Sequence, residues 1–156
     1  MKKVISVVIF LTVPFFIYAQ SEKDDLKIMI DTAIQIKYLP FVHNLKAAGE
    51  DQGDLYLIDE QNRPLNYLHL PDSFKLRFIN ILDIGNRTIM KKGVHAWKVF
   101  TKLTKNQFVV SIIDFRIKYT GNNNYDFSNG GGAEAVFEYD CSENKWKLVS
   151  SQDRGI

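Results

Sequence analysis

The spacing of apolar residues predicts one amphipathic helix in the first third of the chain. Residues 21–24 (SEKD) have the form of an N-terminal capping box, and apolar side chains recur behind them at helical spacing. These are Leu26, Met29, Ile30, Ala33 and Ile34, with Tyr38 extending the stripe. We expect the helix to end before Pro40, because the residue ahead of a proline is driven away from helical backbone angles. Residues 43–54 carry two glycines and several charges, so we expect a loop there.

The middle of the chain predicts short strands and one brief helix. Leu55–Ile58 is an apolar run closed by the polar residues 59–64, which indicates a strand followed by a turn. In residues 65–84, Phe74, Leu76 and Phe78 alternate as in a strand, although the apolar positions of 78–82 also suit a buried helix. We expect a strand. Residues 86–93 predict one or two helical turns ended by a glycine.

The last third of the chain predicts four strands joined by short turns. The expected strands are residues 95–103, 108–119, 133–140 and 146–150. Lys105-Asn106 forms the first turn, Asn122–Asn124 lies in the next loop, and Ser142–Asn144 forms the last turn. Together these elements predict an α+β domain. Its N-terminal helix packs on a curved antiparallel β-sheet, of which the C-terminal part is a four-stranded meander.

The first 19 residues have the order of a secretory signal peptide. Lys2 and Lys3 precede an uncharged apolar run that ends at Ala19, a small residue suited to cleavage. The run is shorter than the roughly 20 residues that cross a bilayer, and Pro14 lies within it. No cysteine lies near the expected cut, where a lipid-anchored precursor has its first mature residue, so we expect no lipid anchor. The mature protein, residues 20–156, is then a single domain in the periplasm or outside the cell.

Charge argues against a nucleic-acid partner. The precursor has 20 basic and 18 acidic residues, and removal of Lys2 and Lys3 with the signal leaves 18 of each. A formally neutral domain lacks the clustered positive charge that nucleic acids require.

Cysteine, histidine and glycine supply no recognised catalytic or metal-binding motif. Cys141 is the only cysteine, so no internal disulfide forms, and we expect it to be a semi-buried small apolar residue at a strand end. His43, His69 and His95 lie in separate segments without metal-ligand spacing, so we expect neither a metal nor a cofactor. Gly130–Gly132 lacks the lysine and hydroxyl of a phosphate loop and is expected to form a bulge or the flexible start of a strand.

The best candidate site lies in the strand over residues 108–119. One face of this strand is expected to be core; it carries Val109, Ser111, Ile113, Phe115, Ile117 and Tyr119. The opposite face begins apolar with Phe108, Val110 and Ile112 and then becomes charged at Asp114, Arg116 and Lys118. Asp114 is a candidate base and Arg116 a candidate anion clamp, with Tyr119 and Glu134 as further ligand candidates. The alternative is routine cross-strand pairing with Glu134 or Glu138 on a solvated face.

Aromatic residues outside the predicted core are candidates for contact with a protein partner. Tyr125 and Phe127 lie in the expected loop 121–130 and are the best candidates of this kind.

The C-terminal segment resembles a group of small secreted bacterial proteins. The resemblance rests on Gly130–Cys141 (GGGAEAVFEYDC), followed by Asn144–Leu148 (NKWKL). The order of a helix and then a meander is similar to the nuclear-transport-factor-2-like and cystatin-like folds, over residues 90–156. These folds host enzymes, inhibitors, immunity proteins and binding modules, so the resemblance implies a fold and no catalytic residue.

Two functions remain open from the sequence. The first is a non-catalytic secreted or periplasmic binding module of the immunity or inhibitor type, which binds a protein partner through loops 43–54 and 121–130. The second is a nuclear-transport-factor-2-like enzyme or ligand carrier that uses the cavity between helix and sheet. In the second case Asp114, Arg116 and Tyr119 lie near the mouth of the cavity.

Overall fold

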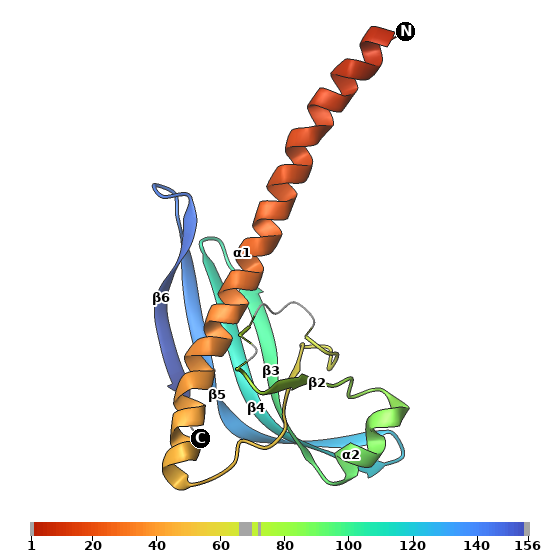
Figure 1. Cartoon of the computed structure of the whole chain (residues 1–156), viewed down its shortest axis with the longest axis vertical. Helices are drawn as coiled ribbons and strands as arrows, with labels where there is room; N and C mark the ends of the chain where they lie inside the picture. Colours follow the sequence, from red (N-terminus) through yellow and green to blue (C-terminus); the bar gives the residue numbers. More distant parts are fainter. Residues whose placement is uncertain (1, 66–69, 72, 155–156) are drawn as a thin grey trace.

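The computed structural model describes residues 2–65, 70–71 and 73–154, with side chains over 25–65, 70–71 and 73–153. In chain order, its elements are α1 (Lys2–Ala48), β1 (Leu55–Ile58), β2 (Leu76–Phe78), the 3-10 turn η1 (Ile84–Asn86), α2 (Arg87–Lys91), β3 (Val94–Leu103), β4 (Gln107–Gly121), β5 (Asn124–Asp140) and β6 (Lys145–Arg154). The strands form one curved sheet in the order β2-β1-β3-β4-β5-β6, and α1 lies across one of its faces (Figure 1). The α+β prediction is therefore confirmed at this level.

The predicted signal peptide and capping box fall on positions whose side chains lie outside the described residues. In the part of the chain that the structure describes, no helix combines the length and apolar character needed to cross a bilayer.

The sheet is mixed, whereas the sequence predicted an antiparallel one. Strands β3 to β6 form the expected antiparallel meander. Strand β1, however, runs parallel to both of its neighbours, with Leu55 opposite Leu76 of β2 and opposite His95 of β3. The segment between β1 and β3 contains β2, η1 and α2, and a connection of this kind is what parallel strands require. Among the described residues of 65–84, where the sequence predicts a strand, only Leu76–Phe78 (β2) forms one. The buried Ile79 and Ile81 follow it outside any strand.

The predicted apolar stripe of α1 forms the first core. Met29, Ala33, Ile34 and Tyr38 are all at most 5% exposed, and they pack on the sheet around the fully buried Trp97. The stripe is confirmed from Met29 onward, whereas Leu26 is 38% exposed.

The predicted end of the helix before Pro40 is wrong. Helix α1 continues to Ala48, so residues 43–48 are helical and the expected loop 43–54 begins only after them. Phe41, in the turn after the proline, packs edge-on against Trp97 with ring centroids 5.3 Å apart. Packing of this kind offsets part of the cost of the hydrogen bond that proline removes. The helix ends at Gly49, whose φ of 71° and the bond from Glu50 N to Leu45 O form a Schellman cap.

A second core lies on the opposite face of the sheet, beneath α2. It contains Met90 of α2, together with Val94 and Ala96 of β3 and Ile117 of β4. Both faces of β4 are therefore buried, at different ends. The side expected to be core packs here through Phe115, Ile117 and Tyr119, and the apolar start of the other side, Phe108, Val110 and Ile112, packs against α1.

The glycine run forms a bulge within a strand and does not precede one. Strand β5 begins at Asn124, so the expected loop 121–130 is mostly strand, joined to β4 by a tight turn at Asn122 and Asn123. Ile113 lies opposite Gly132 and Phe115 opposite Asn129, so β5 contains one extra residue here. Of the two forms expected from the sequence, the bulge is confirmed and the flexible start of a strand is not.

Candidate functional site

Strand register brings polar side chains into a row at one end of the sheet. His95 of β3 lies opposite Arg116 of β4, and Arg116 lies opposite Ser128 of β5. Residues directly opposite each other point to the same face, with Cα atoms about 4.5–5.5 Å apart. In the next row Trp97 lies opposite Asp114. The charged end of β4 therefore meets polar groups from the strands on both sides.

Both carboxylate oxygens of Asp114 have hydrogen-bond partners on β3. Its Oδ1 is bonded to Nε2 of His95, and its Oδ2 accepts a hydrogen bond of 3.3 Å from Nε1 of Trp97. The Trp97 side chain is fully buried, whereas the side chains of Asp114 and His95 are 16% and 38% exposed. The edge of Phe41 also contacts the imidazole ring, at 5.9 Å between centroids. A rigid indole thus fixes the carboxylate, and the carboxylate with Phe41 orients a half-exposed imidazole.

This group borders a cleft of about 690 Å³. The walls come from the loop after α1, from β1, from the end of α2, from the start of β3, and from the adjoining parts of β4 and β5. The residues concerned are Gln52, Gly53, Asp54, Tyr56, Ile89, Lys92, Gly93, Val94, His95, Asp114, Arg116, Ser128, Asn129 and Gly130. Residues from six segments therefore surround one volume large enough for a small molecule.

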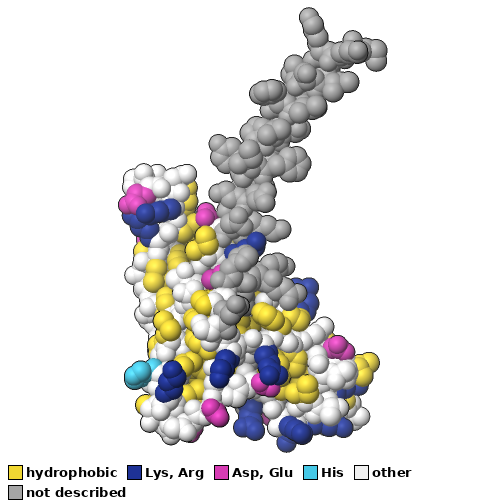
Figure 2. All heavy atoms as spheres, viewed as in Figure 1, with side chains coloured by type: hydrophobic (Ala, Val, Ile, Leu, Met, Phe, Trp, Pro, Cys, Tyr) yellow, Lys and Arg dark blue, Asp and Glu magenta, His cyan; other side chains and the backbone are white. Residues whose placement is uncertain are grey.

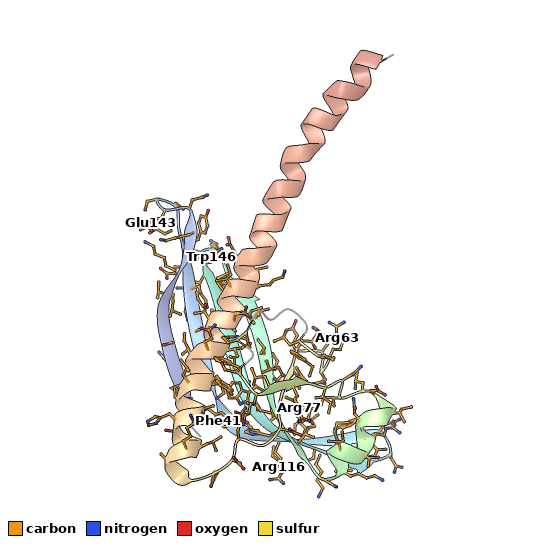
Figure 3. All side chains as sticks on the ribbon, in the orientation of Figure 1. Phe41, Arg63, Arg77, Arg116, Glu143 and Trp146 are labelled. Atoms are coloured by element: carbon orange, nitrogen blue, oxygen red, sulfur yellow. The ribbon has the colours of Figure 1, made fainter. Side chains whose placement is uncertain are left out.

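The cleft contains two acidic and two permanently basic side chains. The acidic side chains are bonded to other residues, whereas the basic ones have no acidic partner in the part of the chain that the structure describes. Asp54 forms an ion pair of 3.0 Å with Arg77, and Asp114 is bonded to His95 and Trp97. Among the described residues, Lys92 and Arg116 form no ion pair with an acidic side chain. Arg116 projects at the lower end of the sheet, between the end of α1 and α2 (Figure 3), where several Lys and Arg side chains are exposed (Figure 2).

The Arg116 side chain lies directly against Gly93. This residue ends the turn after α2 with a φ of 86°, a conformation that favours glycine. A Cβ atom at this position would stand 3.2 Å from Nε of Arg116. The guanidinium therefore lies directly against the backbone of the cleft wall.

The structure brings together two of the four ligand candidates. Asp114 and Arg116 line the cleft, whereas Tyr119 and Glu134 do not. Tyr119 packs on Tyr125, at 5.2 Å between centroids, and beneath the guanidinium of Arg87. Glu134 lies opposite Ser111, whose hydroxyl donates to it at 3.3 Å.

The expected cross-strand pairing of these charges with Glu134 or Glu138 is not what the register produces. Arg116 lies opposite Ser128, and Lys118 lies opposite Asp126. Glu138 lies opposite Gln107, which donates a 2.7 Å hydrogen bond to it. Arg116 and Lys118 therefore face neither of the two glutamates named from the sequence.

The two partner-binding candidates lie on β5 and not in a loop. Phe127 contacts Phe115 edge-on at 5.7 Å between centroids, and Tyr125 contacts Tyr119. Both side chains pack against the second core and are half-buried.

Sequence reasoning missed His95, Trp97 and Lys92 as parts of the site. A signal was present for two of them, because the turn at Lys105-Asn106 sets the register of the β3–β4 hairpin. Counting back from that turn places Trp97 opposite Asp114 and His95 beside it. Lys92 follows a separate helix, and its position depends on tertiary packing.

Cys141 lies in the turn after β5 and is exposed, so the semi-buried position expected from the sequence is wrong. Within the described ranges, no three His, Cys, Asp or Glu side chains gather closely enough to hold a metal ion. His69 lies outside those ranges.

Comparison of the chain with protein-family models, with curated proteins and with solved structures found no match. The resemblance to the nuclear-transport-factor-2-like and cystatin-like folds therefore stays a prediction.

Proposed function

We propose that this protein binds a small polar molecule in the cleft at the charged end of β4, which is the ligand-carrier function considered from the sequence. The observation that carries the proposal is the convergence of His95, Asp114 and Arg116 on one cleft. A fixed carboxylate, an oriented imidazole and a guanidinium are the convergent polar groups that specify ligands in small-molecule sites. On this proposal the protein acts after export, in the periplasm or outside the cell.

The test is a screen of small polar metabolites by amide chemical-shift mapping on the purified protein. A true ligand is expected to shift the amides of Gly93, His95 and Arg116, and to raise the melting temperature. Asp114→Ala should weaken this binding, because it releases both His95 and Trp97. Lys118→Ala is the matched control, since Lys118 lies on the same strand but outside the cleft. Shifts that cluster elsewhere, or a full screen without a ligand, would refute the proposal.

A second proposal, binding of a protein partner, is supported by a different observation. Leu82, Ile84 and Ile89 are 59%, 71% and 47% exposed in the segment around η1 and α2. Exposed apolar side chains gathered in this way are typical of docking surfaces. The expected loops 43–54 and 121–130 support this function less, because each is partly helix or strand. Partner capture that Ile84→Asp abolishes and Lys118→Ala leaves intact would favour the second proposal.

A further inference from the structure

We infer that the molecule bound in this cleft is an anion, held through a carboxylate or phosphoryl group by Arg116 and Lys92. The inference rests on the proposed small-molecule function and names the chemical class of the ligand. Carboxylates and phosphoryl groups share the feature that matters here, which is negatively charged oxygen that accepts hydrogen bonds.

The first argument is the charge that remains after the side chains of the cleft have paired. Asp54 and Asp114 are each held by a partner, the one by Arg77 and the other by His95 and Trp97. The guanidinium of Arg116 and the ammonium of Lys92 have no acidic partner among the described residues. A cationic ligand would therefore meet two like charges, whereas an anion would supply the missing counter-charge.

The second argument is the way in which Arg116 is presented. Its guanidinium lies against the backbone at Gly93, where an added Cβ would stand 3.2 Å from Nε, and it is flanked in its row by His95 and Ser128. Guanidinium presents its donors as a planar fork that matches the two oxygens of a carboxylate or phosphate. The neighbouring imidazole and hydroxyl have the hydrogen-bonding capacity to complete the site.

The third argument is that the two carboxylates of the cleft are already bonded to other residues of the protein. Asp114 borders the cleft, but both of its carboxylate oxygens are bonded, Oδ1 to Nε2 of His95 and Oδ2 to Nε1 of Trp97. Asp54 is directed toward Arg77, which does not line the cleft. Both carboxylates are therefore engaged by groups of the protein, whereas the cationic groups of Arg116 and Lys92 have no acidic partner among the described residues.

The experiment titrates the purified protein with three simple probes: inorganic phosphate, acetate and the ethylammonium cation. We expect phosphate or acetate to shift the amides of Gly93, Arg116 and Ser128, and ethylammonium to leave them in place. Binding should weaken as sodium chloride is raised from about 0.05 to 0.5 M, because salt screens the attraction. If only phosphate binds, the site prefers a tetrahedral phosphoryl group. If only acetate binds, the site prefers a planar carboxylate.

Variants connect the binding to the two basic residues. Arg116→Gln should weaken anion binding about tenfold to hundredfold, the range for one charge-assisted partner, and Lys92→Gln should weaken it less. Arg116→Lys should restore part of the affinity, because it retains the charge without the planar fork. Arg63→Gln is the control with the same change of charge, since Arg63 pairs with Asp59 on the turn after β1, away from Arg116 (Figure 3). Circular dichroism checks that each variant is folded.

The possible failures are distinguishable. If neutral or cationic molecules occupy the cleft and Arg116→Gln does not weaken their binding, the anion inference is overturned and the proposed function stands. Anion binding that Arg116→Gln and Arg63→Gln reduce equally would show attraction to net charge alone and would also overturn the inference. If no molecule of any charge shifts the amides of the cleft, both are refuted.

Discussion

Replacement of Pro40 by alanine is the sharpest test of how α1 is built. In the structure Pro40 lies inside the helix, which continues for two further turns to Ala48. A proline in a helix interior removes one backbone hydrogen bond, here to the carbonyl of Ile36, and its ring crowds that carbonyl. The Pro40 side chain is exposed, so its loss removes little packing. Alanine should therefore stabilise the protein.

The magnitude follows from two opposing effects. Alanine is favoured over proline by about 3 kcal/mol in a helix interior. Proline restricts the unfolded chain, and its removal returns about 0.4–1 kcal/mol of conformational freedom to that state. We expect a net gain of about 2 kcal/mol, which corresponds to a rise in melting temperature of roughly 5 °C for a domain of this size.

The assay is urea and thermal unfolding of the two proteins, followed by circular dichroism. If the helix instead ended before Pro40, as the sequence pattern predicts, alanine would only loosen a turn and the stability would fall by up to about 1 kcal/mol. A helix that continues through Pro40 and a helix that ends before it therefore predict changes in stability of opposite sign for Pro40→Ala. Leu39→Ala is the control, because Leu39 is 62% exposed and its truncation should change stability by less than about 0.5 kcal/mol.

Three further predictions concern other parts of the structure. Tyr38→Phe should cost about 1 kcal/mol in urea unfolding, because the phenol donates to Gln52 at 2.9 Å and accepts from Lys75 N at 3.0 Å. Gly93→Ala should lower both the melting temperature, through strain at a φ of 86°, and the affinity for phosphate, through displacement of Arg116. The pKa of Asp140 is held below its usual value by the hydrogen bond from Lys147 and then by those from Ser142. This stabilisation is present above about pH 4 and is lost as the pH falls further, so between pH 5 and 2 the natural protein should lose more melting temperature than Asp140→Asn.

Much of the fold could be predicted from the sequence because local patterns determine it. The alternation in residues 95–150 predicts four strands, and the short turns between them require an antiparallel meander. The parallel pairing of β1 could not be predicted in this way, because it depends on where the chain returns after α2. Past Pro40, α1 packs Phe41 on Trp97, a contact between residues far apart in the sequence that the local pattern does not contain. Local rules therefore fail where a long-range contact outweighs them.

In the candidate site too, local sequence patterns predict some residues, whereas long-range contacts determine the others. The change from apolar to charged residues along one face of the 108–119 strand identifies Asp114 and Arg116, because such a face must end at water or at a ligand. Tyr119 alternates to the opposite face and packs in the second core, and Glu134 lies beyond the bulge, opposite Ser111. Periodicity thus identified the strand and the face of the site, whereas its other members come from register and from the packing of α2.

The glycine run explains why the carboxylate of Asp114 is available to the cleft at all. In a regular ladder Asp114 would have a β5 residue directly opposite, with a side chain on the same face. The bulge leaves Asp114 between the paired positions Ile113 and Phe115, and a Cβ on Gly130 would stand 3.5 Å from its carboxyl carbon. At Gly132 a Cβ would approach the Ile112 carbonyl oxygen to 2.8 Å, so only glycine lets the two strands come this close. The same three residues that lack the lysine and hydroxyl of a phosphate loop thus open the sheet beside Asp114 and Arg116.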